Sequence, residues 1–188
     1  MARVTLIDDD KHPDLAPLIG KLKGNRGGKL INVYRLLLNS PAVADAWETF
    51  NSTLRGTFSG DLRICEIVII RVAILNRTEY IFRIHVPRLS DRAGLSTTEV
   101  EALYDWRASQ AFSAREQAAL ACTDVLTRDA DVPDAVFAEA AAHFSEQQLV
   151  ELMVLIGAYN MHSRVMRGLR NDIEPGTEGP SAPWRPVG

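Results

Sequence analysis

Cysteine is scarce in this sequence, which has two thiols, Cys65 and Cys122, among its 188 residues. They lie apart in apolar or helical surroundings, without the spacing of a disulfide framework or of a zinc site. Because Cys65 stands beside Glu66 in an apolar run, we interpret it as a small core residue rather than a nucleophile. This cysteine usage fits a reducing compartment, and we expect a cytoplasmic protein.

An excess of basic charge is also missing. The formal net charge is −3 with both signs interspersed, so the sequence has no electrostatic footprint for nucleic acid or an anionic membrane. The longest apolar run is interrupted by Arg71 and is too short to cross a bilayer, and the N-terminus lacks the apolar stretch of a signal peptide. Without a Gly-rich phosphate loop, a G-x-S-x-G motif or a His/Cys cluster, we expect neither a cofactor nor a metal.

Alternating strand patterns do not compete with the helical signals of this chain. Capping boxes begin at Ser96, Ser113 and Ser145, and Ser40-Pro41 has the composition of a helix start. These features predict an all-α protein. Pro87 falls inside one predicted helix and either kinks it or ends it. The predicted helices are 29–39, 41–54, 61–75, 78–92, 96–108, 113–127, 134–143 and 145–169.

The ends of the chain differ in composition from its centre. Residues 1–28 mix proline, glycine and polar residues and predict an irregular arm with a short helix. Residues 29–170 predict a single helical domain. Residues 171–188 form a polar, Pro- and Gly-rich tail, which is either disordered or laid across a neighbouring element, with Trp184 as its one candidate anchor.

The centre of the chain carries one acid inside an almost wholly apolar helix. Burying the lone carboxylate of Glu66 is costly unless it has a partner or is protonated. A turn at 76–78 makes an antiparallel hairpin of the two flanking helices, with Thr78 able to cap the second. Glu66 lies about ten residues before this turn and His85 about nine after it, so both stand at about the same height. A carboxylate and an imidazole at one level make a candidate acid/base pair.

The alternative for Glu66 and His85 is a structural pair that only fixes two helices. Other side chains could bind a substrate. Arg71 could hold a carboxylate bidentately, although it could equally pair with a core acid. Tyr80 could donate to a developing oxyanion, and Tyr34 could line a pocket, although both could simply pack.

A weak internal repeat relates two stretches of the chain. Residues 62–73 resemble residues 148–159, and an offset of about 85 residues aligns Glu66 with Glu151, which suggests two similar helical units. The second copy has no histidine in the place of His85. We interpret His162, which stands elsewhere in that helix beside other polar groups, as part of a core network rather than a second site.

Several of these motifs resemble one protein family. The sequence L-R-x-x-E at 62–66, the pair Glu79-Tyr80, His85 before Val-Pro, and AGLS at 93–96 are similar to the carboxymuconolactone decarboxylase and alkylhydroperoxidase family. The resemblance extends over 31–169. It implies an alkylhydroperoxidase-like helical bundle, and it places Glu66 and His85 on the family's proton-relay glutamate and histidine.

The resemblance implies a homo-oligomer, commonly a dimer, trimer or hexamer, and a small-molecule substrate. The peroxidase branch carries a Cys-x-x-Cys pair before its histidine, and here Thr78 and Ile81 occupy those positions. We therefore expect a cofactor-free acid/base lyase, decarboxylase or isomerase acting on a small organic acid or lactone through Glu66 and His85. The alternatives are an alkylhydroperoxidase-type antioxidant enzyme and a non-catalytic oligomeric binding protein.

Overall fold

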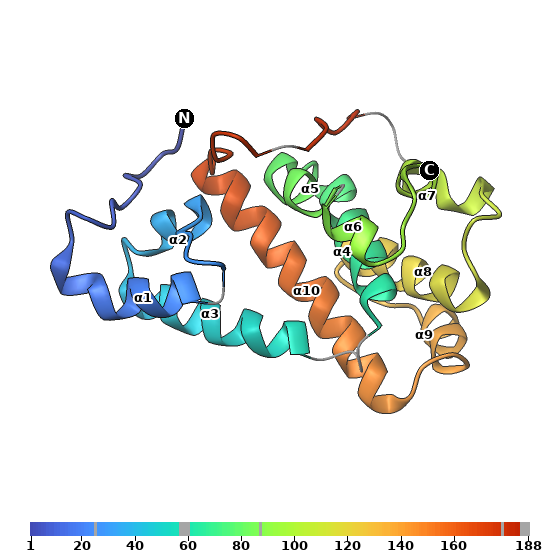
Figure 1. The fold of residues 1–188 in the computed structure, drawn as a ribbon. Coiled ribbons are helices and arrows are strands. Elements are labelled where there is room, and N and C mark those ends of the chain that lie inside the picture. Colours follow the sequence, from blue (N-terminus) through green and yellow to red (C-terminus); the bar gives the residue numbers. More distant parts are fainter. Residues whose placement is uncertain (25, 57–60, 87, 178, 185–188) are drawn as a thin grey trace.

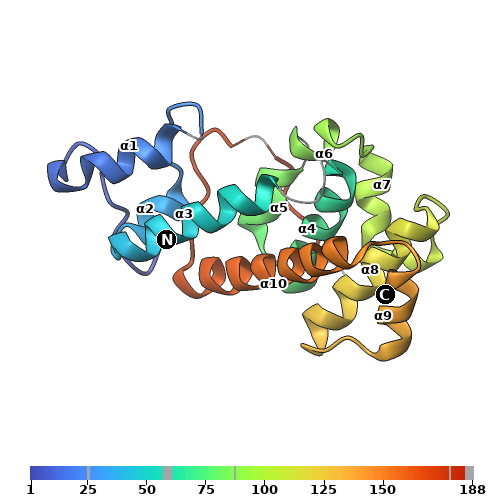
Figure 2. The same cartoon turned by 90° about the horizontal axis from the view of Figure 1, so that it is seen from below.

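The computed structural model describes residues 1–24, 26–56, 61–86, 88–177 and 179–184. Within these ranges the regular structure is helical and contains no strand, which confirms the all-α prediction. The long helix α10 (Glu146–Leu169) runs through the middle of the molecule. Helices α1 to α3 lie toward one end of it and α7 to α9 toward the other (Figure 1; Figure 2, from below).

The remaining helices precede α10 in the chain. In order they are η1 (Pro13–Leu15), α1 (Ala16–Gly24), α2 (Asn32–Leu37), α3 (Pro41–Gly56), α4 (Leu62–Asn76), α5 (Glu79–His85), α6 (Arg88–Arg92), α7 (Thr97–Ala102), η3 (Leu103–Ala108), α8 (Ala114–Arg128) and α9 (Asp134–Ala141). Searched over the described residues, no helix is long and apolar enough to span a membrane.

Helix α4 forms the centre of the core, packed against both α8 and α10. Its Ile- and Val-rich sequence favours a strand on local propensity, but burial on all sides overrides that preference. Asp61 caps the helix by accepting a hydrogen bond from the backbone of Ile64 at 3.1 Å. Arg77 ends it in the left-handed conformation. The two copies of the internal repeat are thus neighbouring helices of one core.

A buried ion pair ties α4 to α8. The Arg71 guanidinium binds the Asp124 carboxylate through two bonds, Nε to Oδ1 at 2.6 Å and Nη2 to Oδ2 at 2.9 Å. Its Nη1 donates to the Leu103 carbonyl at 2.6 Å, and Trp106 Nε1 donates to Asp124 Oδ2 at 3.2 Å. Arg71 and Asp124 are 0% and 1% exposed, so the buried guanidinium needs the carboxylate as its counter-ion, and Asp124 also pairs with Arg107 at 2.7 Å.

Two predicted helices are divided in the structure. The predicted helix 78–92 becomes α5 and α6, separated at Val86, whose backbone is extended (φ −109°, ψ 131°) as expected for a residue before proline. Pro87 itself lies outside the described residues. The predicted helix 96–108 becomes α7 and the 3₁₀ helix η3, where Asp105 leaves helical geometry (φ −141°, ψ 63°). The buried Arg71 side chain takes the Leu103 and Tyr104 carbonyls, which a regular α-helix would use internally.

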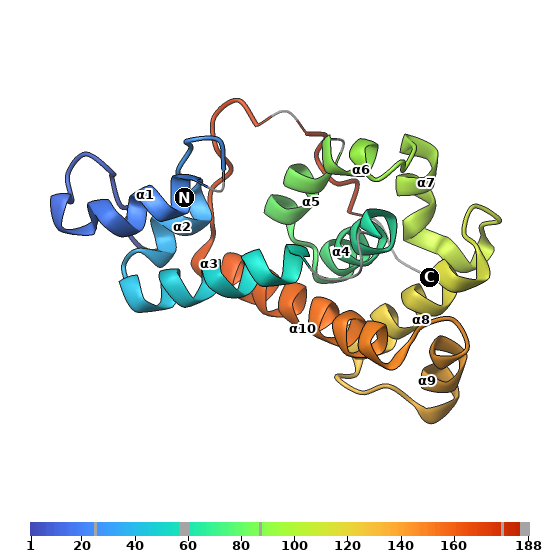
Figure 3. The same cartoon turned by 60° about the horizontal axis from the view of Figure 1, so that its bottom comes forward.

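The described part of the C-terminal tail lies across α5 (Figure 3). Glu174 Oε1 accepts hydrogen bonds from the Tyr80 hydroxyl at 2.8 Å and from the Asn32 backbone at 2.6 Å. The Trp184 ring meets Phe82 edge-on, with centroids 6.1 Å apart. Of the two alternatives for the tail, the described residues therefore follow the second, and Trp184 contacts the domain.

Candidate active site

The predicted hairpin brings the acid and the imidazole together. Helices α4 and α5 are joined by Arg77 and Thr78, and Glu66 Oε2 lies 2.7 Å from His85 Nδ1. Glu66 and His85 are 9% and 8% exposed, so the contact is nearly dry. The structure thus confirms that the turn after residue 76 brings the side chains of Glu66 and His85 into contact.

This contact determines which imidazole nitrogen can react. An ionised carboxylate can accept hydrogen bonds but cannot donate them, so with Glu66 ionised the ring proton of His85 is on Nδ1. The other nitrogen, Nε2, makes no hydrogen bond to a residue that the structure describes. His85 Nε2 is then the basic lone pair, and Glu66 is placed to stabilise the imidazolium that forms when Nε2 takes a proton.

A chain of aromatic rings continues from His85 to α3. The rings of His85 and Tyr159 meet edge-on with centroids 5.6 Å apart, and Tyr159 meets His162 in the same way at 5.0 Å. Trp47 of α3 stacks on His162 at 4.5 Å. The site therefore draws side chains from four helices, α3, α4, α5 and α10.

His162 differs from the other polar groups near it. Asn160 belongs to a hydrogen-bonded core network, since its amide donates to Thr127 Oγ1 and accepts from Asn76. His162 Nε2, by contrast, is buried without a hydrogen-bond partner among the described residues. Burial, reinforced by the nearby His85, lowers the pKa of His162 to about 4. The sequence signal for its role was the spacing of Tyr159 and His162, which lie on one face of a helix.

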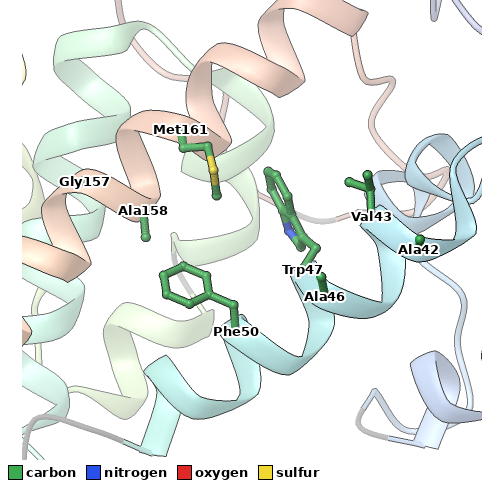
Figure 4. A pocket seen from close by; sticks show the side chains of 8 residues that line it. All are labelled: Ala42, Val43, Ala46, Trp47, Phe50, Gly157, Ala158 and Met161. Carbon is green, nitrogen blue, oxygen red and sulfur yellow. The ribbon is translucent and has the colours of Figure 1, made fainter.

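An open apolar groove with a volume of about 590 Å³ lies beside Trp47. Trp47 and Phe50 of α3 face Met161 and Ala158 of α10 across it (Figure 4). Its lining carries no charged side chain. Trp47 thus contributes both to this groove and, through His162 and Tyr159, to the ring chain that ends at His85.

The three side chains predicted to bind substrate are engaged elsewhere. Arg71 belongs to the buried pair with Asp124, which is the alternative that we gave for it. The Tyr80 hydroxyl donates to Glu174 at 2.8 Å, and the Tyr34 hydroxyl donates to Glu48 at 2.5 Å. Each of these three polar groups thus has a partner within the protein and needs no ligand to satisfy it. The proposal below therefore rests on Glu66 and His85 alone.

Neither thiol is placed for nucleophilic chemistry. Burial, followed by the negative charge of Glu66, raises the pKa of Cys65 to about 12. Burial raises the pKa of Cys122 to about 11. A thiolate is the reactive form of cysteine, and both sites disfavour it.

Within the described ranges one group of acids is close enough to share a metal ion. It consists of Asp8, Asp9 and Asp10 in the N-terminal arm. Two of the three already have cationic partners, since Lys11 binds Asp8 at 2.9 Å and Lys23 binds Asp9. The cluster is acidic and open, and nothing at it indicates a bound ion.

The part of the chain that contains Glu66 and His85 matches a known protein family. Residues 41–124, which include Glu66 and His85, match the model of the Carboxymuconolactone decarboxylase family. The uncharacterized protein YnjA of Escherichia coli (strain K12) is 34% identical over 99 residues, which make up 52% of this chain and 54% of YnjA. The chain therefore matches about half the length of that relative.

Solved structures show the same fold. ATU0492 from Agrobacterium tumefaciens, a protein of unknown function named as a candidate antioxidant defence protein AhpD, is 28% identical with a TM-score of 0.68, covering 74% of this chain and 95% of that one. An uncharacterized peroxidase-related protein from Silicibacter sp. TM1040 has a TM-score of 0.79 at 18% identity, covering 95% and 94%. The predicted resemblance and the alkylhydroperoxidase-like fold are confirmed.

The low pKa of His162 predicts acid-sensitive stability. The unfolded chain titrates this group near its ordinary pKa of about 6.5, so between that pH and about 4 the unfolded state binds more protons. The free energy of unfolding should fall as pH falls through this window, by up to about 1.4 kcal/mol per pH unit. Urea denaturation of wild type and His162→Phe between pH values of about 7 and 5 measures the difference.

The His162→Phe variant keeps the stacked ring but cannot titrate, so its stability should depend less on pH in this window. His143→Gln, which removes a partly buried histidine just after α9 and leaves the rings around His162 in place, serves as the control for the loss of an imidazole. Equal slopes for wild type and His162→Phe would show that His162 is not held neutral in the folded protein.

Proposed function

From its relationship to the carboxymuconolactone decarboxylase family, we propose that this protein is an enzyme that moves protons without a cofactor. His85 Nε2 acts as the general base and then as the acid, and Glu66 orients the ring and stabilises its protonated form. The substrate class is a small organic acid or lactone, and the reaction is a decarboxylation, isomerisation or elimination. The observation that carries the proposal is the contact of 2.7 Å between Glu66 Oε2 and His85 Nδ1.

The surroundings of the pair support this role. A general base works best when it is held in one tautomer and orientation, and Glu66 and the edge of Tyr159 both restrict the His85 ring. A nearly dry site strengthens the electrostatic coupling of carboxylate and imidazolium. A pair that only fixes two helices would use the same bond, but it would not require that His85 Nε2 lack a hydrogen-bond partner among the described residues.

A thiol peroxidase is the less favoured alternative. Reduction of a peroxide needs a thiolate of low pKa and a second thiol that resolves the oxidised intermediate. Thr78 and Ile81 stand where the family's peroxidases carry cysteines, and burial raises the pKa of the two thiols that are present. Two structural relatives are named as a peroxidase-related protein and as a candidate AhpD, but those names apply to those proteins. The cysteine pair that a thiol peroxidase needs is absent from this sequence.

We also propose that the chain assembles as a homo-oligomer through α3 and α10. Large apolar side chains are exposed along both helices. Val150, Val154 and Met161 lie on one face of α10, at 64%, 40% and 40% exposure. Val43 and Phe50 continue this surface on α3, beside the apolar groove. A second copy of the chain would remove this area from water.

Substitution of the pair tests the catalytic proposal. A panel of γ-lactones and small carboxylic acids is screened by thermal shift, and the compounds that bind are assayed for turnover by NMR. For a compound that is turned over, Glu66→Gln and His85→Gln should each lower the rate by about 10² to 10⁴ while the fold is retained. Glu151→Gln, which changes the corresponding acid of the repeat, is the matched control and should keep the wild-type rate.

Wild-type rates in both Glu66→Gln and His85→Gln would contradict the assignment. Binding without turnover of any compound in the panel would favour the non-catalytic alternative, a binding protein that uses the same fold.

Peroxide assays separate the two enzyme classes. With dithiothreitol and cumene hydroperoxide, we expect the wild type to consume no peroxide above the background of the thiol alone. The double variant Thr78→Cys/Ile81→Cys, which installs the missing pair before His85, should gain thiol-dependent turnover and serves as the positive control. Peroxide consumption by the wild type that is lost in Cys65→Ser would reverse this conclusion.

Light scattering after size exclusion tests the assembly. Wild type should elute as a multiple of the chain mass of 20.8 kDa, and Val154→Glu should shift toward the monomer because a charge cannot be buried there unpaired. Phe137→Glu is the control, since Phe137 has a similar exposure of 42% but lies on α9, outside the two helices of the proposed interface. A monomeric wild type, or equal effects of the two substitutions, would contradict the proposed interface.

A further inference from the structure

Helices α4 and α10 end in the same way. Each ends in an arginine in the left-handed conformation, Arg77 and Arg170, both with φ of 52°. The residue after each arginine closes the turn, with the backbone of Thr78 donating to Ala73 at 2.9 Å and that of Asn171 donating to Met166 at 2.9 Å. Both helix ends are therefore Schellman motifs, in which glycine is the usual residue at the left-handed position.

Arginine at these two positions has a conformational cost. A side chain disfavours the left-handed region, where glycine or asparagine is far more common. Among the described residues only three that are not glycine adopt a positive φ, namely Arg77, Arg170 and Ala130. Two of the three line one pocket, and strained residues that gather in one place point to a function that requires their side chains.

This pocket, with a volume of about 220 Å³, has a strongly basic lining. Arg77, Arg167 and Arg170 supply three guanidinium groups, against one carboxylate, that of Glu79. Glu79 is already bound to Arg83 at 2.6 Å. Arg167 donates to the carbonyl of Asn76 at 2.6 Å, which accounts for it as a helix-capping side chain. Capping does not account for Arg77 and Arg170, which form no ion pair with a described residue.

The pocket also contains unsatisfied polar groups. Thr78 occupies the N-cap position of α5 but makes no capping bond, and its hydroxyl is buried without a hydrogen-bond partner in the described chain. The prediction that Thr78 caps this helix through its side chain is therefore wrong. The Asn171 amide, which lies near the Tyr80 hydroxyl, likewise makes no hydrogen bond of standard geometry. Thr78 and Asn171 are both among the residues that line the pocket, each next to the arginine that precedes it, and their polar side-chain atoms are buried behind that lining.

We infer that this pocket binds a small oxyanion, a carboxylate or a phosphate, between Arg77 and Arg170. Guanidinium groups bind such anions through charge-assisted, often bidentate hydrogen bonds. The Thr78 hydroxyl and the Asn171 amide can supply the neutral donors that complete the shell of an oxyanion. The inference does not depend on the proposed catalytic role of Glu66 and His85, which lie toward the other end of α5.

Glycine variants separate binding from folding. Arg77→Gly and Arg170→Gly each remove a guanidinium and also relieve the left-handed backbone, so the melting temperature without ligand should stay at or above that of wild type. The affinity for the anion should nevertheless fall at least tenfold in each variant. Isothermal titration calorimetry with inorganic phosphate and, separately, with succinate at constant ionic strength measures this and shows which oxyanion the pocket prefers.

Ala130→Gly is the matched control. It relieves the third strained position without removing a charge, so it should match the thermal behaviour of the arginine variants and keep wild-type affinity. Saturable binding of either anion that is lost with both arginines supports the site. The proposed site would be overturned if the wild type bound neither phosphate nor succinate, or if Arg77→Gly and Arg170→Gly bound them as tightly as the wild type.

Discussion

Helix α4 is buried on every side from Glu66 to Ile74, so each charge inside this part must be neutralised within the protein. It carries two buried charges, Glu66 and Arg71, which meet partners on different helices. Arg71 is neutralised by Asp124 of α8, and Glu66 is hydrogen-bonded to His85 of α5. Removing one member of such a pair leaves an uncompensated buried charge, which is costly in a core. The two buried charges of α4 therefore help to fix the positions of α5 and α8, because each of these helices carries the partner of one charge.

The two pairs nevertheless have different chemical freedom. Arg71 and Asp124 are both permanently charged near neutral pH, and their bidentate contact and the Leu103 carbonyl use the donors of the guanidinium. In the pair of Glu66 and His85, one ring nitrogen contacts the carboxylate, and the second nitrogen has no hydrogen-bond partner in the part of the chain that the structure describes. The first arrangement suits a clamp and the second suits proton transfer, although both fix helices to the same central element.

The contact between Glu66 and His85 was predictable from the sequence, because in a helical hairpin two residues equally far from the turn lie at the same level along the helices. Glu66 and His85 are 19 residues apart, and a turn midway places them level on facing helices. Arg71 and Asp124 are 53 residues apart, with three turns of unknown direction between them, so the sequence left several acids open as partners. The division of the helix predicted over 96–108 could not be foreseen for the same reason, since its cause is a buried guanidinium from α4 that takes the Leu103 carbonyl.

Helix α5 is where these constraints converge. A helix of seven residues is too short to be stable alone, so its position depends on tertiary contacts. At one end His85 binds Glu66, along its length Tyr80 and Phe82 contact the C-terminal tail, and at its start the Arg77 turn joins it to α4. An anion bound between Arg77 and Arg170 would join the ends of α4 and α10 at that start. Because α10 also carries Tyr159, whose ring touches His85, an occupied pocket would restrict both helices that hold the imidazole.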